Sequence, residues 1–258
     1  MSYRALKHFG QHFLTDKNHL QKIVSAINPQ TQQLMVEVGP GMGALTKHIV
    51  PLTDHLHVVE IDKRFIELLR EQFSPAELTV HAENALKFDF ASIIPSEQKI
   101  RIIGNLPYNI STPLIFHFLK FKSSIEDMTF LLQKEVVDRM VAKPGNKTYG
   151  RLSVMVQYDC QTTPLFDVPP GAFTPPPKVN SAVVHLKPLT RSLTATNYGH
   201  FSLVVSLAFQ QRRKTIRNSL KSQISAEQLS ALSIEPTRRP ETLSVDDFVR
   251  ISNLVNAS

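Results

Sequence analysis

The sequence has very little cysteine and no long apolar run. Cys160 is the only cysteine, so no intrachain disulfide can form. No stretch approaches the roughly 18 apolar residues that a membrane-spanning helix needs. The first residues, MSYRALKHFGQHFL, lack the apolar segment of a secretory signal peptide. We therefore expect a reducing, cytoplasmic setting and no membrane partner.

Acidic side chains are also in deficit. There are 22 Asp and Glu residues against 29 Lys and Arg residues, which leaves a formal net charge of +7. Such an excess favours polyanionic partners without saying which, although solvated surface charge is the plainer explanation. The 42% hydrophobic content of 258 residues is enough for one large core and a smaller appendage.

Several catalytic and metal-binding patterns are missing as well. No G-x-S-x-G elbow supports serine hydrolase chemistry. Cys160 has no activating neighbour in the sequence and is better explained as a small core residue. His8 and His12 have helical spacing, but no third ligand with metal-site spacing accompanies them. We therefore predict no metal site.

The first two thirds of the chain alternate short β-branched runs with helical patterns. This alternation predicts βαβ units and a parallel sheet covered on both faces. A threonine before a proline, Thr112-Pro113, predicts the start of a helix. The apolar runs lie at residues 34–38, 57–61, 78–81, 100–103 and 128–132, and the helical patterns include residues 62–73 and 113–121.

The last third changes character. Prolines cluster over residues 164–177 and predict a stiff, extended connection before a strand at residues 182–186. Beyond Pro188 only helical patterns follow. Ser225 with Gln228, and Ser244 with Asp247, have capping-box spacing. The sequence thus predicts a large α/β domain over residues 1–190 and a small all-helical domain over residues 191–258.

A glycine-rich turn follows the first predicted strand. In Val38-Gly39-Pro40-Gly41-Met42-Gly43 the glycines allow a sharp turn and a close approach of the backbone to a ligand. Glu60 ends the next strand, where an acid can accept hydrogen bonds from both ribose hydroxyls. The pair predicts a nucleoside cofactor rather than a mere tight turn with a surface glutamate.

The identity of this cofactor is less settled by these residues, because NAD enzymes share the architecture. The spacing here is G-x-G-x-G and not the dinucleotide form G-x-G-x-x-G. Glu37, just before the turn, would repel a pyrophosphate but would suit the cationic groups of S-adenosylmethionine. S-adenosylmethionine therefore fits better.

A second motif, GNLPYNIS, stands at the exit of the strand near residue 103. An adenine amine is a poor nucleophile until its nitrogen becomes more tetrahedral, and two hydrogen-bond acceptors can favour that change. Asn105 can supply a side-chain oxygen and Leu106 a backbone carbonyl. Pro107 stiffens the next peptide, and Tyr108 offers a ring for stacking of the base. A turn-capping Asn105 with a core Tyr108 is the alternative explanation.

These motifs together resemble those of the KsgA (RsmA)-type ribosomal RNA adenine dimethyltransferase family, and the likeness extends over essentially the whole chain. Phe173, in a proline-rich motif, is similar to the family phenylalanine that is thought to face the target base. The matching segments are residues 9–14, 37–43, 60, 105–108, 173–181 and 209–220.

The resemblance implies a Rossmann-like methyltransferase domain and S-adenosylmethionine as methyl donor. It implies methylation at N6 of two adjacent adenosines in a hairpin loop near the 3′ end of 16S rRNA, each dimethylated, within the small ribosomal subunit or its precursor. The implied catalytic residues are Asn105, Leu106, Pro107, Tyr108 and Phe173. The implied cofactor residues are His12, Leu14, Gly39, Gly41, Glu60, Asn84 and Asn105.

Two of these positions depart from the family pattern. The family generally has Asn at the position of His12 and Asp at the position of Asn84. Asn84 can still accept a hydrogen bond from the cofactor adenine, without the strengthening effect of a charge. Glu83 could take over this role by a one-residue shift.

The basic residues near the end of the chain suggest where RNA binds. Residues 206–226 contain five Lys or Arg and no acid. If residues 201–220 form one continuous helix, its basic face meets phosphate, although a solvated face is the usual explanation. The cations on that face are Arg213, Lys214, Arg217 and Lys221.

Other functions remain open at this point. They are a 23S rRNA methyltransferase, as in related antibiotic-resistance enzymes, a DNA adenine methyltransferase, and a mainly non-catalytic factor for small-subunit assembly. The motif at residues 209–220 favours the small-subunit group. We expect a monomer.

Overall fold

The computed structural model describes residues 11–95, 98–211 and 213–256. His8 and the first two residues of the N-terminal motif, Phe9 and Gly10, lie outside these ranges. The chain divides into two compact units. The first comprises Met1–Val137 and Thr162–Pro188, and the second comprises Asp138–Gln161 and Leu189–Ser258.

The first unit ends at Pro188, close to the predicted boundary at residue 190, but the earlier segment Asp138–Gln161 groups with the second unit. Packing explains the grouping. Tyr158 of α6 (Arg151–Asp159) packs its ring against Phe201 of α7 (Tyr198–Gln210), with 4.4 Å between ring centroids. A helix that precedes the proline-rich segment in sequence therefore completes the core of the helical unit.

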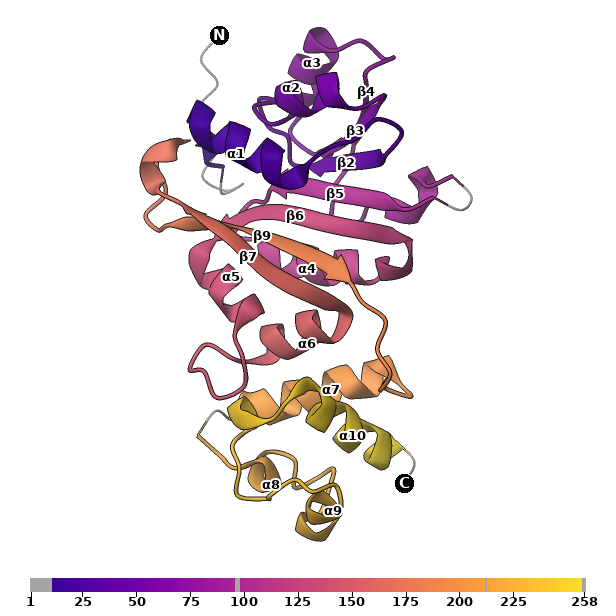
Figure 1. Ribbon diagram of the computed structural model, residues 1–258, viewed down its shortest axis with the longest axis vertical. Coiled ribbons are helices and arrows are strands. Elements are labelled where there is room, and N and C mark those ends of the chain that lie inside the picture. The colour runs from indigo at the N-terminus through magenta and orange to yellow at the C-terminus, as the bar shows by residue number, and fades with distance from the viewer. Residues whose placement is uncertain (1–10, 96–97, 212, 257–258) are drawn as a thin grey trace. The chain divides into compact units, whose positions relative to one another are not determined.

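A seven-stranded sheet forms the first unit, with strand order β4-β3-β2-β5-β6-β9-β7 (Figure 1). Its strands are β2 (Leu34–Val38), β3 (Leu56–Glu60), β4 (Leu78–Ala82), β5 (Ile100–Asn105), β6 (Ile125–Gln133), β7 (Cys160–Val168) and β9 (Ser181–Pro188). The helices that accompany them are α1 (Lys17–Ile27), α2 (Thr46–Ile49), α3 (Lys63–Gln72), α4 (Ser111–Leu119) and α5 (Lys134–Val141), with short 3₁₀ turns at Val50–Leu52, Phe90–Ile93, Lys122–Ser124 and Pro170–Ala172.

The prediction of a wholly parallel sheet is wrong at one edge. The pairs among β4, β3, β2, β5 and β6 are parallel, but β9 runs antiparallel to β6, with Ser181 opposite Gln133. The chain enters β9 beside the carboxyl end of β6, so it can only run back. β7, which contains Pro164, was not predicted as a strand. It lies at the edge of the sheet, where a missing N–H is tolerated.

Helices cover both faces of the sheet. On one face, Leu20, Ile23 and Ile27 of α1 pack in one cluster with Ile103 of β5 and Leu131 of β6. On the opposite face the Phe118 ring of α4 stacks on Phe130 of β6, with centroids 5.2 Å apart. The predicted covering of both faces is therefore confirmed.

The helix predicted at Thr112-Pro113 is present as α4, but Thr112 does not cap it. Ile110 occupies the N-cap position without a side-chain capping bond, and the helix begins at Ser111. The Ser111 hydroxyl donates to the Tyr108 carbonyl at 3.2 Å. Pro113 still lies within the first turn, where a backbone N–H has no helical partner.

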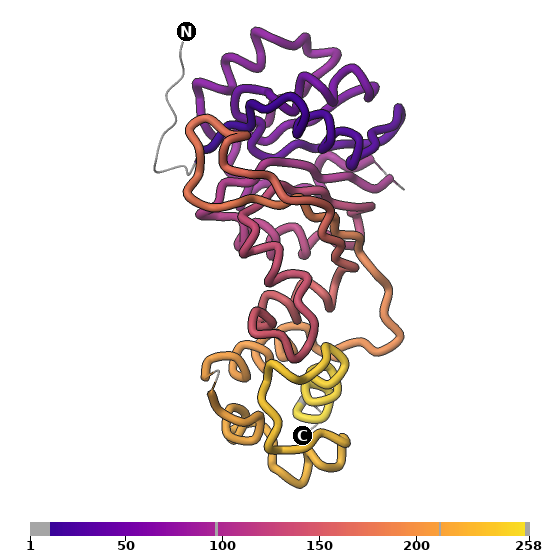
Figure 2. The backbone as a smooth tube through the Cα atoms, turned by 60° about the vertical axis from the view of Figure 1, so that its left-hand side comes forward, coloured from indigo at the N-terminus to yellow at the C-terminus, as the bar shows by residue number. Residues whose placement is uncertain are grey.

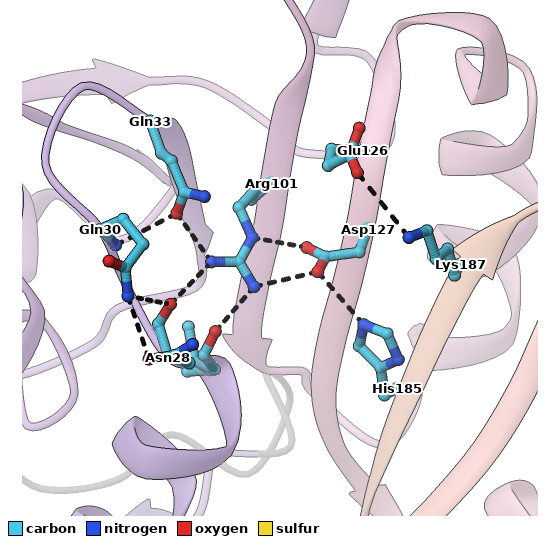
Figure 3. Close-up of polar contacts among 9 residues, drawn as sticks. Asn28, Gln30, Gln33, Arg101, Glu126, Asp127, His185 and Lys187 are labelled. Atoms are coloured by element: carbon cyan, nitrogen blue, oxygen red, sulfur yellow. Dashed lines mark hydrogen bonds and ion pairs between the residues drawn. The ribbon is translucent and has the colours of Figure 1, made fainter.

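A network around the buried Arg101 holds the end of α1 against the amino ends of β5 and β6 (Figure 3). Arg101, which is 8% exposed, uses both Nε and Nη2 to bind the Asp127 carboxylate at 2.8 and 2.9 Å. Its other N–H groups donate to the Ile27 and Asn28 carbonyls and to Gln33 Oε1, and His185 Nε2 lies 3.2 Å from Asp127 Oδ2. All five guanidinium donors thus have acceptors. The carbonyl end of α1 is thereby anchored to β5 and β6.

A small two-stranded sheet joins two distant parts of the sequence. β1 (Phe13–Leu14) pairs antiparallel with β8 (Phe173–Thr174). In Figure 2 the orange segment around β8 accordingly lies beside the indigo start of the described chain. The proline-rich motif and the N-terminal motif, 160 residues apart in sequence, are therefore neighbours in the fold.

The second unit is helical. Besides α6 and α7 it contains α8 (Ile216–Ser219), α9 (Ala226–Ala231), α10 (Val245–Asn256) and a 3₁₀ turn at Pro240–Thr242. Both predicted capping boxes are confirmed, because Ser225 and Gln228, and likewise Ser244 and Asp247, exchange side-chain to backbone bonds. None of the helices within the described ranges combines the length and the apolar character that a membrane span requires.

The continuous helix over residues 201–220 is wrong. α7 ends at Gln210 and α8 begins at Ile216, with Thr215 as its N-cap. The Lys214 N–H turns back to the Gln211 carbonyl at 2.9 Å, and the Thr215 hydroxyl accepts from the Asn218 N–H. This local capping outcompetes the helical periodicity of the sequence.

Candidate active site

A cavity of about 250 Å³ opens at the carboxyl ends of the parallel strands. Its walls come from β1, the glycine turn after β2, the end of β3 and the exit of β5, with α1 contributing Leu20 and Ile23. Ligands of open α/β sheets bind at this edge. The position of the cavity is therefore the one that the strand order predicts.

The glycine turn has the backbone geometry that its sequence demands. Gly39 and Gly41 have φ angles of 67° and 55°, in the left-handed region. A Cβ atom at Gly41 would lie 3.2 Å from the Phe13 ring, so a side chain there would disturb both the turn and β1. The helix that follows is short, since α2 has only four residues.

Glu60 supports this turn from the end of β3. Its Oε2 accepts the Gly41 N–H at 3.1 Å, and its Oε1 accepts the N–H groups of Ile61 and Asp62 at 2.8 and 2.9 Å. Burial raises the pKa of this carboxyl, and these backbone hydrogen bonds partly oppose the rise. The carboxylate keeps acceptor capacity on Oε2, because two oxygens offer about four lone pairs.

Glu37 is a second buried acid of the cavity and is 2% exposed. The Thr46 hydroxyl donates to its Oε2 at 2.6 Å. Burial raises the pKa of Glu37 to about 7, the Thr46 bond opposes this rise, and the charge of Glu60 adds to it. Neither acid has a basic partner among the residues that the structure describes.

This donor set fits S-adenosylmethionine. Two buried carboxyl groups without a cation disfavour a pyrophosphate and favour a ligand with positive charge. The turn allows backbone approach, and Glu60 retains a free acceptor site for a ribose hydroxyl. Glu37, Glu60 and the turn residues would hold such a cofactor.

Asn105 lies at the exit of β5, and one hydrogen bond orients its side chain. Its Nδ2 donates to the His12 carbonyl at 2.9 Å. Because a carbonyl only accepts, this assignment leaves Asn105 Oδ1 as an acceptor facing elsewhere. No hydrogen bond to Oδ1 is found among the described residues. Asn105 lines the cavity, so its Oδ1 offers a free acceptor there.

Gly104 places the strand exit close to the glycine turn. A Cβ atom at this position would lie 2.5 Å from the Val38 carbonyl oxygen, closer than side chains tolerate. The next residue but one, Leu106, donates its N–H to the Leu131 carbonyl at 3.2 Å and is 1% exposed. The backbone of the NLPY motif is therefore fixed on both sides.

Tyr108 is a half-buried ring of the cavity wall. Its hydroxyl lies 2.5 Å from Ser181 Oγ at the start of β9, and its ring stacks on that of His12 with centroids 5.4 Å apart. Burial raises the pKa of the phenol, although the Ser181 bond opposes this. The group therefore stays a neutral phenol near neutral pH.

The structure brings most of the predicted site residues together. Those that line the cavity are His12, Leu14, Gly39, Gly41, Glu60, Asn84, Asn105, Leu106, Pro107 and Tyr108. Phe173 does not line it. It is 3% exposed and packs in the apolar cluster beneath β1.

Asn84 reaches the cavity with its side chain already engaged. Its Oδ1 accepts the Leu86 N–H at 3.0 Å, which closes a local turn. A carboxamide oxygen has two lone pairs, so one acceptor site remains. Glu83 is exposed and does not line the cavity, and this placement does not support the one-residue shift.

The four predicted RNA contacts belong to the second unit and do not share one helix. Arg213 and Lys214 lie in the turn after α7, Arg217 lies in α8, and Lys221 follows it. All four are exposed. Arg212 of the same motif lies outside the described residues.

Some residues of the site escaped the sequence-based prediction. Phe13 and Ser181 belong to quoted motifs, but nothing in their residue type distinguishes them. Gly104 had a usable signal, because a glycine inside a strand often marks a close backbone approach. Among the described residues no group of three or more His, Cys, Asp or Glu could hold a metal ion.

The fold is a mixed parallel and antiparallel sheet covered by helices, and the site combines the glycine turn, two buried acids and an asparagine at the exit of β5. Together these features define a Rossmann-like methyltransferase. The family model for ribosomal RNA adenine dimethylases matches residues 3–257. The chain therefore belongs to the ribosomal RNA adenine dimethylase family and is an S-adenosylmethionine-dependent rRNA adenine dimethyltransferase.

Full-length relatives agree with this assignment. The chain is 51% identical to the ribosomal RNA small subunit methyltransferase A of Alcanivorax borkumensis over 253 residues, which covers 98% of this chain and 90% of that protein. It is also 51% identical to the protein of the same name from Aromatoleum aromaticum over 256 residues, with 99% and 96% coverage.

Solved structures show the same fold. A dimethyladenosine transferase from Plasmodium falciparum superposes with a TM-score of 0.79 at 26% identity, and the match covers 93% of this chain and 96% of that one. The 23S rRNA methyltransferase ErmE superposes with a TM-score of 0.71 at 22% identity, with 95% and 99% coverage. The second likeness concerns the fold alone.

Proposed function

We propose that this chain dimethylates N6 of two adjacent adenosines in the loop of a hairpin near the 3′ end of 16S rRNA, and that it acts on the small ribosomal subunit or its precursor. Support comes from relatives that are 51% identical over 98% and 99% of this chain and are named small subunit methyltransferases. A role in subunit biogenesis follows from that substrate.

The observation that carries the mechanism is the free acceptor of Asn105. Its Nδ2 is tied to the His12 carbonyl, so Oδ1 is available to accept from an adenine amine. The Leu106 carbonyl is the second acceptor. Two acceptors draw the amine nitrogen towards a tetrahedral shape and so localise its lone pair. The alkylated amine then loses its extra proton to water, and the site needs no strong base.

The remaining residues bind and orient. When bound, S-adenosylmethionine supplies an electrophilic methyl group on a sulfonium. Leu14, Gly39, Gly41, Glu60 and Asn84, together with His12 and Asn105, line the cavity and would hold this cofactor. Pro107 keeps the motif rigid, and the Tyr108 ring stacks on the base. Phe173 reaches the base only if the segment around β8 shifts, because its ring is buried.

RNA contacts outside the site are electrostatic. The exposed cations Arg213, Lys214, Arg217 and Lys221 bind phosphates and position the RNA without reading its sequence. An enzyme that modifies a base needs it unstacked, which favours a loop over a duplex. The protein acts as a monomer in the cytoplasm.

Product mapping tests this function. The full chain is incubated with labelled S-adenosylmethionine and, separately, undermethylated small subunits, naked 16S rRNA, naked 23S rRNA and duplex DNA, followed by mass spectrometry. We expect N6,N6-dimethyladenosine at two adjacent 16S positions and none in the other nucleic acids. Label that accumulates in 23S rRNA or DNA would contradict the proposal.

Asn105→Ala tests the mechanism. Single-turnover methyl transfer should fall about 10²-fold or more, by analogy with the loss of one preorganised contact to a transition state. Asn18→Ala, an exposed asparagine of α1, is the matched control and should keep the full rate. An unchanged rate in Asn105→Ala would remove Asn105 from the mechanism.

A further inference from the structure

His12 is held by three segments of the first unit at once. Its carbonyl accepts from Asn105 Nδ2 at 2.9 Å, its Nδ1 lies 2.8 Å from the Pro175 carbonyl, and its ring stacks on Tyr108. These contacts connect the residue before β1 to the exit of β5 and to the segment between β8 and β9. His12 thus contacts both the Asn105 carboxamide and the Tyr108 ring.

The chemistry of the Pro175 contact determines how the imidazole is held. A carbonyl oxygen only accepts, so Nδ1 carries a proton and donates it. The ring is therefore fixed at one edge by Pro175 and on one face by Tyr108, with an interplanar angle of 26°. It cannot change its orientation in the cavity wall without losing both contacts.

Tyr108 is fixed in turn from two directions. Ser181 holds its hydroxyl at 2.5 Å, and the imidazole covers part of one ring face. The half-buried ring lines the cavity, where a planar ligand can reach it. Aromatic side chains gain most from stacking when their orientation is set in advance, since no rotamer freedom is lost on binding.

We propose that His12 is a positioning residue for the target base. Its ring backs Tyr108 so that the adenine stacks on the opposite face, and its carbonyl aims the Asn105 carboxamide. The side chain thereby serves the nucleobase rather than the cofactor. The inference rests on the proposed roles of Asn105 and Tyr108 and goes beyond them by assigning the side chain at position 12 to base recognition.

Three variants separate the ring from the hydrogen bond. His12→Ala removes both, His12→Phe keeps a ring, and His12→Asn keeps a donor. In the full chain with undermethylated small subunits, kcat of His12→Ala should fall about three- to tenfold, the range that one aromatic pair supplies. His12→Phe should recover most of this loss, and His12→Asn should not. Calorimetry should give a Kd for S-adenosylmethionine within about twofold of the unchanged chain for each variant.

Several outcomes would overturn the proposal. They are an unchanged kcat in His12→Ala, a His12→Phe variant as slow as His12→Ala, or a tenfold weaker Kd for S-adenosylmethionine with an unchanged rate at saturation. The last result would make His12 a cofactor contact. Thermal unfolding of each variant identifies a general loss of structure.

A double-mutant cycle distinguishes this inference from the proposed function itself. Because His12 acts through Tyr108, His12→Ala should add little to the loss caused by Tyr108→Ala. Full additivity of the two losses would contradict the backing role. Asn105→Ala serves as the reference. If Asn105→Ala keeps its rate, the proposed mechanism fails; if it loses its rate while His12→Ala does not, the His12 inference alone fails.

Discussion

At the amino ends of β5 and β6, the buried Arg101 guanidinium is bonded to the partly buried Asp127 carboxylate. At the carboxyl ends of β2 and β3, by contrast, the buried acids Glu37 and Glu60 have only hydroxyl and amide partners among the described residues. Both groups lie on the same face of one sheet, because the register aligns Glu37 with Ile103 and Arg101 with Asp127. The same fold therefore treats buried charge in two ways.

The pKa directions follow this difference. Burial would raise the pKa of Asp127, but hydrogen bonds from His185 and Arg101 outweigh it and lower the value. Burial outweighs the hydrogen bonds to Glu37 and Glu60, and the pKa values of these two acids are therefore raised. A charge that is paired inside the protein stabilises the fold, and one that is left unpaired marks the end of the sheet where a ligand with positive charge binds.

The largest effect is expected when the Arg101–Asp127 ion pair is broken. Asp127→Ala leaves the Arg101 guanidinium buried without its counterion and should lower the free energy of unfolding by about 3–5 kcal/mol. Urea denaturation measures the change. Glu126→Ala removes an exposed acid of the same strand with only a loose contact to Lys187 and should change stability by less than about 0.5 kcal/mol. Equal losses in the two variants would show that the network adds nothing.

A smaller effect, on cofactor binding, is expected at Glu60, which has no basic partner among the described residues. Glu60→Gln replaces an oxygen that accepts the Gly41 N–H and should weaken S-adenosylmethionine binding about 10- to 100-fold, the range for a lost hydrogen bond to a charged group. Isothermal titration measures the Kd. Glu71→Gln, on the exposed side of α3, should bind normally. Normal binding by Glu60→Gln would remove this acid from the cofactor site.

Glu37→Gln tests the comparison through pH. The folded pKa of about 7 lies above the ordinary 4.5, so the native state holds the proton more tightly than the unfolded chain. This stabilisation is complete below about pH 4.5 and is lost as pH rises through about 7. Relative to the unchanged chain, Glu37→Gln should therefore gain on the order of 1–3 kcal/mol of stability between pH 5 and pH 8.

The same variant should lose affinity for the cationic cofactor. In the unchanged chain, S-adenosylmethionine should bind more tightly as pH rises through 7, because Glu37 then carries its charge. In Glu37→Gln this dependence should flatten. Titrations in two buffers with different ionisation enthalpies detect the proton that the unchanged chain releases on binding. Equal proton release in both chains would contradict the role of Glu37.

The smallest effect, a change in the affinity for S-adenosylmethionine, is expected at position 84. Asn84→Asp adds a charge that can still accept the Leu86 N–H and can accept a second, charge-assisted bond from an adenine amine. The Kd for S-adenosylmethionine should fall by a few-fold, measured against Asn18→Ala as an unaffected control. Weaker binding by Asn84→Asp would indicate that position 84 does not accept from the cofactor.

Much of the fold was predictable because its signals are local. Six strand positions, those of β2, β3, β4, β5, β6 and β9, followed from β-branched runs, and both capping boxes followed from side chains three residues apart. The reversal of β9, the β1–β8 pair and the break before α8 were not predictable in this way. They depend on where the chain arrives after a long connection, or on a cap at Thr215 that periodicity alone does not weigh.

The sequence by itself determined the chemistry of the two turns: glycines with positive φ after β2, and an amide, a proline and a tyrosine after β5. Sterics and hydrogen bonding within a few residues decide such features. Only the tertiary structure decided that Asn105 is aimed by a carbonyl 93 residues away, that Phe173 is buried, and that Arg101 is paired while Glu37 is not. Those outcomes depend on which strands pack side by side, because burial and partner distance set the energy of a charge or an amide.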